Sequence, residues 1–164
     1  MNIKRTSHLH KTIILEMRNI LLCIIFLVVG CTPPAAYTAF CPVDSEQWMP
    51  AEKVCFNIKT AAPQEAHTLY IYARTCEAHR YSQRTLPLIV TQEWQHLKEQ
   101  RTDTVIVEIA DTLGNYTGKG IHHRDITVPL SSVYHTDSLI GSITIRPCTA
   151  TPVHGISHIG VELR

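Results

Sequence analysis

Apolar and polar side chains alternate along most of this chain, and that period of two limits its fold more than any other feature. The segment VCFNIK at 54–59 carries an apolar residue at every second position, and LYIYAR at 69–74 does the same. Similar runs begin at Leu86, Val105, Ile126, Leu139 and Ile159. Because successive side chains of a strand point to opposite faces of its sheet, this alternation is typical of half-buried strands.

Turn-forming segments separate these runs, among them AAPQEA, DTLGNYTGKG and ATPVHG. Only WQHLKEQR, residues 94–101, predicts one or two helical turns. Pro87 indicates that its strand lies at a sheet edge, because proline cannot donate to a ladder. Short strands at regular spacing predict an all-β fold, an antiparallel β-sandwich of about seven or eight strands.

The N-terminal part has the pattern of a bacterial lipoprotein signal peptide. The uninterrupted apolar run Ile20–Val29 follows Arg18 and leads through Gly30 into Cys31. The run is about half as long as a membrane-spanning helix needs, so a cleaved signal fits better than a transmembrane segment. We predict cleavage before Cys31 and lipidation of its thiol. An ordinary cleaved signal and a short anchor helix are the alternatives.

The predicted organisation therefore has three parts. Residues 1–30 form the signal peptide, 31–40 a lipidated tether and 41–164 the sandwich domain. Met17 begins a sequence that would be a complete signal by itself, so residues 1–16 are either an untranslated extension or a long basic leader.

Cleavage changes the charge of the chain. The signal contains 4 of the 15 Lys and Arg residues and 1 of the 14 acidic residues, which leaves 11 basic against 13 acidic side chains and a net charge of −2. A chain with no basic excess is a poor candidate for binding nucleic acid. The lipid makes the membrane a predicted partner.

Export also affects how the remaining cysteines are interpreted. An even number of thiols in an oxidising compartment predicts two disulfides, for which three connectivities are possible. The strand phases place most of these cysteines on outer faces, and we prefer the pairs Cys41–Cys55 and Cys76–Cys148. Four free or partly buried thiols are the alternative.

No motif predicts catalysis, a metal site or a cofactor. His122 and His123 are adjacent, so on a strand they point to opposite faces. GNYTGKG at 114–120 lacks the Walker spacing and fits a glycine-rich hairpin better than a phosphate loop. Asp103 and Asp111 fit solvated charges at strand ends better than a catalytic carboxylate pair. The expectation is a protein that is not an enzyme.

Aromatic residues offer a different kind of site. Tyr70 and Tyr72 share one strand face, opposite Leu69 and Ile71. That face is either exposed or covered by the lead-in segment around Phe40 and Trp48. Tyr70, Tyr72 and Trp48 are therefore the candidate face for a partner or for a ligand such as a glycan.

Several segments, in order, resemble the gliding-motility lipoprotein family GldH of the Bacteroidota. They are the lipobox, a tryptophan ahead of a V-x-F strand (Trp48 and Val54–Phe56), the strand LYIYAR with Tyr81 beyond it, the run TDTVIVEIADTLGNYTGKG, and the final segment Gly155–Val161.

The resemblance implies an accessory lipoprotein of the gliding-motility and type IX secretion apparatus, whose partners are other cell-envelope motility and secretion proteins. It also implies an outer-membrane location on the periplasmic side. The alternative is an outer-membrane lipoprotein that binds a glycan or another ligand through its aromatic face.

Overall fold

The computed structural model describes residues 35–61, 66–76, 81–95, 100–135 and 138–164. They belong to one compact unit, Ala35–Arg164. The predicted signal peptide and Cys31 lie outside the described residues. No helix of the described part is long and apolar enough to cross a membrane.

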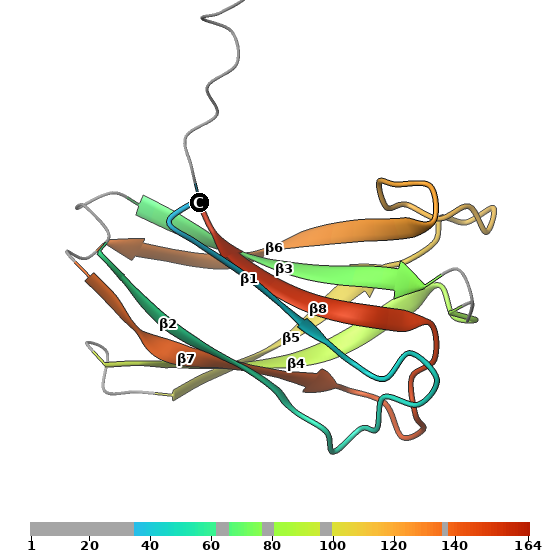
Figure 1. Ribbon diagram of the computed structural model, residues 1–164, viewed down its shortest axis with the longest axis horizontal. Helices are drawn as coiled ribbons and strands as arrows, with labels where there is room; N and C mark the ends of the chain where they lie inside the picture. The colour runs from blue at the N-terminus through green and yellow to red at the C-terminus, as the bar shows by residue number, and fades with distance from the viewer. Residues whose placement is uncertain (1–34, 62–65, 77–80, 96–99, 136–137) are drawn as a thin grey trace, which may run out of the picture. The chain divides into compact units, whose positions relative to one another are not determined.

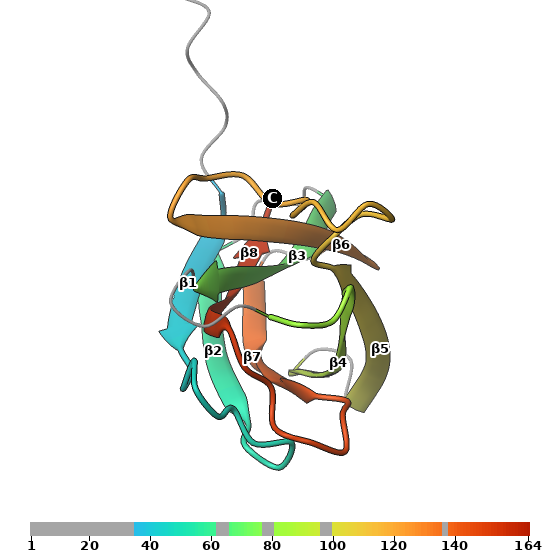
Figure 2. The same ribbon diagram turned by 90° about the vertical axis from the view of Figure 1, so that its right-hand side faces the viewer.

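The fold is an all-β sandwich, as predicted, made of two antiparallel four-stranded sheets (Figures 1 and 2). One sheet has the order β1-β8-β3-β6 and the other the order β2-β7-β4-β5. The strands are β1 (Tyr37–Pro42), β2 (Val54–Ala61), β3 (Ala66–Cys76), β4 (Thr85–Trp94), β5 (Gln100–Glu108), β6 (His123–His135), β7 (Ser138–Pro147) and β8 (Ile156–Leu163).

The strand order gives the sandwich two different ends. At the tether end, β1 begins and β8 finishes, so both termini of the unit lie there; the Ala36 N–H donates to the Leu163 carbonyl at 2.8 Å. The opposite loop end carries the connections 43–53, 109–122 and 148–155, because every strand that precedes one of them runs away from the tether end (Figure 1).

The core lies between the sheets and is built from the apolar phase of each strand. Complete burial of a Leu or Ile side chain contributes about 1.5–3 kcal/mol, so these positions supply most of the driving force for folding. The largest fully buried side chains are Trp48, Ile58, Leu69, Ile71, Leu86, Leu88, Ile109, Ile143, Ile145, Ile156 and Ile159.

Strand β1 begins inside the predicted tether of residues 31–40. It pairs with β8 from Tyr37↔Leu163 to Pro42↔His158, and Tyr37, Ala39 and Cys41 pack against the core. The segment is short and rich in small residues, so its alternation is too weak to predict a strand. Within the described residues, the domain therefore starts earlier than the predicted boundary at 41.

Both edges of this sheet carry a proline where a free N–H would otherwise point outward. The Asp125 N–H donates to the Lys119 carbonyl at 2.9 Å, so Asp125, Thr127 and Pro129 direct their backbone groups away from β3. On β1, the Val43 N–H donates to the Ser157 carbonyl at 2.9 Å, which by alternation places the backbone groups of Pro42 on the outer edge. Proline at such positions discourages pairing with another chain.

Two local predictions need correction. Pro87 does not mark an edge, because β4 lies between β7 and β5. It is tolerated because the β4–β7 ladder ends there: the first registered pair is Leu88↔Pro147. The helical turn expected at 94–101 is also not what the described residues adopt. Trp94 ends β4, and Gln100 and Arg101 begin β5.

Candidate functional site

The outer face of sheet β1-β8-β3-β6 carries the densest network of polar and aromatic contacts. The registers place its outward side chains in rows across four strands. One row contains Glu162 and Tyr70, the next contains Phe40, Gly160 and Tyr72, and the third contains His158, Arg74 and Asp125.

Gly160 makes the middle row possible. A Cβ atom on Gly160 would lie 2.5 Å from two carbons of the Phe40 ring. Without that atom, the Phe40 ring crosses β8 and reaches β3. There it makes an edge-to-face contact with Tyr72, with ring centroids 5.4 Å apart. The Arg74 guanidinium lies 5.3 Å from the Phe40 ring centre, a cation–π distance.

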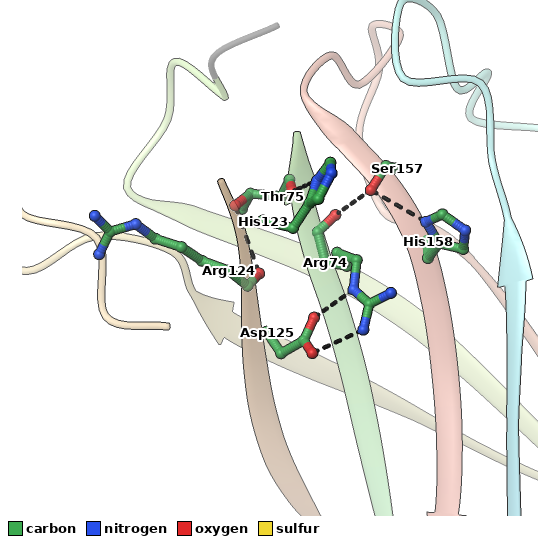
Figure 3. Close-up of polar contacts among 7 residues, drawn as sticks. All are labelled: Arg74, Thr75, His123, Arg124, Asp125, Ser157 and His158. Carbon is green, nitrogen blue, oxygen red and sulfur yellow. Dashed lines mark hydrogen bonds and ion pairs between the residues drawn. The ribbon is translucent and has the colours of Figure 1, made fainter. Parts of the chain in front are cut away.

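Arg74 and Asp125 form a bidentate ion pair across β3 and β6 (Figure 3). The Arg74 Nε and Nη2 atoms donate to the two carboxylate oxygens at 2.6 and 2.8 Å. The Arg74 hydrogen bonds hold the pKa of Asp125 below its usual value, and they raise the pKa of Arg74. Planar two-point pairing of this kind fixes the orientation of both side chains.

Two histidines lie beside this ion pair (Figure 3). The Ser157 hydroxyl donates to the Arg74 carbonyl at 3.3 Å, and its oxygen lies 3.2 Å from His158 Nδ1. His123 Nδ1 lies 3.3 Å from the Thr75 carbonyl. Burial lowers the pKa of His158, and the positive charges of Arg74 and His123 act in the same direction. His158 therefore favours its neutral form.

The tether end of the same face holds a second network. Arg164 donates from Nε and Nη2 to the Glu162 carboxylate at 2.7 and 2.8 Å, and the Tyr72 hydroxyl also donates to Glu162. The Arg164 guanidinium lies 4.9 Å from the Tyr70 ring centre. The Arg164 hydrogen bonds lower the pKa of Glu162, whereas burial and Glu162 raise the pKa of Tyr72.

These networks leave little of the predicted aromatic face available for a ligand. Tyr72 is only 9% exposed, and Arg164 stacks on Tyr70. Trp48 does not belong to this face: it is fully buried in the core, where its backbone bridges to Val153. A bulky ring at the start of a connection fills the core more often than it lines a surface.

The connection 109–122 is the second structured surface. The Asp111 carboxylate accepts hydrogen bonds from the Leu113 and Asn115 N–H groups at 2.8 and 2.9 Å, and from the Asn115 side-chain amide at 3.1 Å. These Asn115 bonds, and that of Leu113, lower the pKa of Asp111. Gly114 has a φ of +84°, which suits glycine in a turn. The hairpin predicted at 114–120 is not formed, because β5 and β6 lie in different sheets and the connection crosses between them.

Residues of the motifs that carry the family resemblance have structural roles in the fold. Trp48 fills the core and Arg74 pairs with Asp125. Tyr81 is buried and donates from its hydroxyl to the Thr85 carbonyl at 2.8 Å; burial raises its pKa to about 12.

Asp103 and Asp111 have separate partners. Asp103 does not lie at a strand end as predicted: it lies within β5, in phase with buried Val105, and its side chain is 27% exposed. Asp103 pairs with Arg101 at 2.9 Å, whereas Asp111 closes its own turn. Among the described residues, no three His, Cys, Asp or Glu side chains gather closely enough to hold a metal ion.

The four cysteines of the domain are free, so the preferred pairs Cys41–Cys55 and Cys76–Cys148 are not formed. A disulfide needs Cβ atoms that face each other at short range. Cys41 packs inward from β1, whereas Cys55 is exposed on the outer side of β2, in the other sheet. Cys76 alternates onto the outer side of one sheet, and exposed Cys148 follows the outward phase of the other.

Sequence reasoning missed the residues that tie the outer face together. Asp125, Glu162 and Arg164 lie in separate parts of the sequence, and only the strand register brings them beside Arg74 and Tyr72. The alternation of Tyr70 and Tyr72 along their strand was the signal available in the sequence. It identified the outer face but could not predict the ion pairs on it.

Comparison with known proteins identifies a family. A family model described as GldH lipoprotein matches residues 35–163. No curated protein matches the chain. Among solved structures, the Eiger TNF of S. frugiperda is similar over 76% of this chain and 83% of that chain, with 10% identity and a TM-score of 0.35. A score that low supports no argument about fold or function.

Proposed function

The chain belongs to the GldH lipoprotein family, and on that premise we propose that it is an accessory component of the gliding-motility and type IX secretion apparatus. In this proposal the protein is held in the outer membrane by lipid on Cys31 and faces the periplasm. It acts by binding other envelope proteins and not by chemistry.

The match of the family model over 35–163 carries this proposal. The position of the domain boundary supports it. Cys31 lies directly before Thr32, and the folded unit begins at Ala35, so the anchor and the domain are separated by a very short segment. Two or three acyl chains on one cysteine would hold such a domain stably at a membrane surface.

The character of the outer face counts against glycan capture there. The charges of Arg74, Asp125 and Glu162 are compensated by partners within the same sheet. Stacking on a sugar needs an open aromatic ring, and Tyr72 is covered. The face is therefore built to stabilise the sheet, and the glycan-binding alternative has no observation in its favour.

The anchor is tested with Cys31→Ala in cells fed an alkyne fatty acid. We expect the wild-type chain to carry the label and to enter the detergent phase on Triton X-114 separation. The variant should remain as uncut precursor without label. Unchanged labelling and partitioning of the variant would contradict lipidation at Cys31.

The role in the apparatus is tested by deleting the gene and restoring it as wild type or as Cys31→Ala. We expect the deletion to impair surface spreading or the release of secreted proteins, and only the wild-type gene to restore it. Normal spreading and secretion in the deletion strain would contradict the proposed role.

A further inference from the structure

We propose that the connection 109–122 is a protein-docking surface whose partner offers an apolar pocket bordered by carboxylates. The inference rests on the proposed function, since it names the surface through which an anchored accessory protein would bind. Leu113 and Ile121 are the residues that would enter the partner.

Both residues are far more exposed than other large apolar side chains of the described domain. Leu113 is 85% exposed and Ile121 is 83% exposed, whereas the next most exposed, Ile106 and Met49, are 59% and 44% exposed. Neither residue contributes to the core, so folding does not require an apolar side chain at these positions. Exposed apolar residues grouped on one connection are typical of interaction sites.

The connection is held in one conformation although its apolar side chains are in solvent. The Asp111 carboxylate fixes the turn that presents Leu113. The Thr117 N–H donates to the Ile109 carbonyl at 3.0 Å, and Lys119 and Asp125 exchange backbone hydrogen bonds of 3.1 and 2.9 Å.

Gly120 fixes the last part of the connection. It has a φ of +126°, and a Cβ atom there would lie 2.0 Å from the His123 carbonyl oxygen. A surface that is already ordered loses less conformational entropy when a partner binds it.

The charges around Ile121 predict the sign of the charge on the partner's surface. Lys119 and His123 are exposed, and the Arg124 guanidinium lies 5.6 Å from the Tyr116 ring centre. The neighbouring acids are already engaged. Asp125 is paired with Arg74, and Glu108 lies 3.7 Å from Arg84. Asp111 bonds to the neutral groups of Leu113 and Asn115 and keeps its charge, so Lys119 and Arg124 leave a surplus of one positive charge on the connection. Carboxylates around the pocket of the partner would complement it.

The place of the connection in the fold favours a protein over the anchoring membrane. It lies at the loop end, whereas β1, the first strand of the folded unit, begins at the tether end (Figure 1). The eight residues of β8 separate the two ends by about 25 Å at the usual rise per residue.

The test places a photo-crosslinking amino acid at Leu113 in the full-length chain in its own cells. Ile140, an exposed apolar residue at the tether end, is the matched control position. We expect a discrete protein adduct from Leu113 and none from Ile140. Mass spectrometry should locate the crosslink in a segment of the partner that contains Asp or Glu.

The identified partner is then purified, and its affinity for the chain is measured at two salt concentrations. We expect Leu113→Asp to weaken binding tenfold or more and Lys119→Glu to weaken it severalfold, with weaker wild-type binding at high salt. Ile140→Asp should have no effect. The melting temperatures should agree, because these side chains are exposed.

Three results would overturn the inference: adducts only with phospholipid, adducts only with a second copy of this chain, or equal adducts from Leu113 and Ile140. Failure of the proposed function appears separately, in the fatty-acid labelling and in the deletion strain. A discrete Leu113 adduct could still be obtained if those experiments failed.

Discussion

The absence of a side chain at Gly160 determines how the outer face of the sheet packs. Its bare backbone lets the Phe40 ring cross β8 and touch both Tyr72 and Arg74. Three strands are thereby joined on the outer face by one ring from the edge strand. The sequence offered the segment around Phe40 as a possible cover of this face, but the contact with Gly160 depends on the Phe40↔Gly160 register.

Gly160→Ala should destabilise the domain by about 1–3 kcal/mol, because the new methyl group would displace the Phe40 ring. In a Phe40→Ala background the same change should be neutral or stabilising, since alanine is favoured over glycine in a strand by roughly 0.5–1 kcal/mol. Urea unfolding of the wild type and the three variants gives the coupling energy. An equal loss of unfolding free energy from Gly160→Ala in both backgrounds would contradict the contact between Gly160 and the Phe40 ring.

Asp125→Asn should reduce the loss of stability in acid. Arg74 holds the pKa of Asp125 below 3.8, so the folded chain binds this proton more weakly than the unfolded chain. The ion pair therefore contributes above about pH 4, and its contribution is lost as the pH falls through the folded-state pKa.

The side chains of this pair are 33% and 36% exposed, so the effect should be about 0.5–1 kcal/mol. The free energy of unfolding measured from pH 2 to pH 6 checks the expectation. Asp103→Asn, in the pair with Arg101, is the control. A wild-type pH profile for Asp125→Asn would count against the role of the ion pair.

Among the elements, β1 depends most on its neighbours. It has six residues, and it pairs with β8 alone. Its connection to the other sheet includes the Tyr37 hydroxyl, which donates to the Asn57 carbonyl at 3.3 Å. Its formation is a consequence of β8 having an open edge, and this is why its own sequence predicted only a tether.

A fragment that starts at Val43 should be several kcal/mol less stable than one that starts at Ala35. Removing β1 takes Tyr37, Ala39 and Cys41 away from the core and leaves the edge of β8 unpaired. Urea unfolding of both fragments measures the difference. If the two fragments were equally stable, β1 would contribute nothing to the stability of the domain. The predicted domain boundary at 41 would then describe the stable unit.

Pro129→Thr should increase self-association through β6. The change restores an outward N–H at the open edge of the sheet, next to the free backbone groups of Thr127. Analytical ultracentrifugation should show more dimer for this variant than for the wild type or for Thr127→Val, which leaves the backbone unchanged. A monomeric Pro129→Thr protein would show that the edge is protected in another way.

Strand patterning allowed the sandwich and most of its strands to be predicted, because burial between two sheets imposes a period of two on every strand. It did not reveal β1, whose inward residues Tyr37, Ala39 and Cys41 are only partly buried. It also placed Pro87 at an edge, since local sequence cannot tell an open edge from the end of a ladder. The outer-face ion pairs depend on register, which alternation leaves undetermined.

At the scale of the molecule, the two ends of the sandwich would have different surroundings if Cys31 is lipidated. Both termini of the unit lie at the tether end. The segment from Cys31 to Ala36 can extend by at most about 18 Å, at roughly 3.6 Å per residue. An upright domain would therefore hold the connection 109–122 well above the bilayer, where other envelope proteins could reach it.

A fluorophore at Lys59→Cys should transfer energy to an acceptor in the lipid headgroups more efficiently than one at Leu113→Cys. Lys59 is exposed near the tether end of β2, whereas Leu113 lies at the loop end. The four free cysteines are first replaced by serine or alanine, and the lipidated chains are reconstituted in vesicles. A chain that begins at Ala35 should show no transfer from either position, because it carries neither the lipid nor the apolar signal segment that could hold the domain at the surface. Equal transfer from the two sites would mean that the domain lies on its side. More efficient transfer from Leu113 would place the loop end against the membrane, and the argument for a protein partner at that end would then fail.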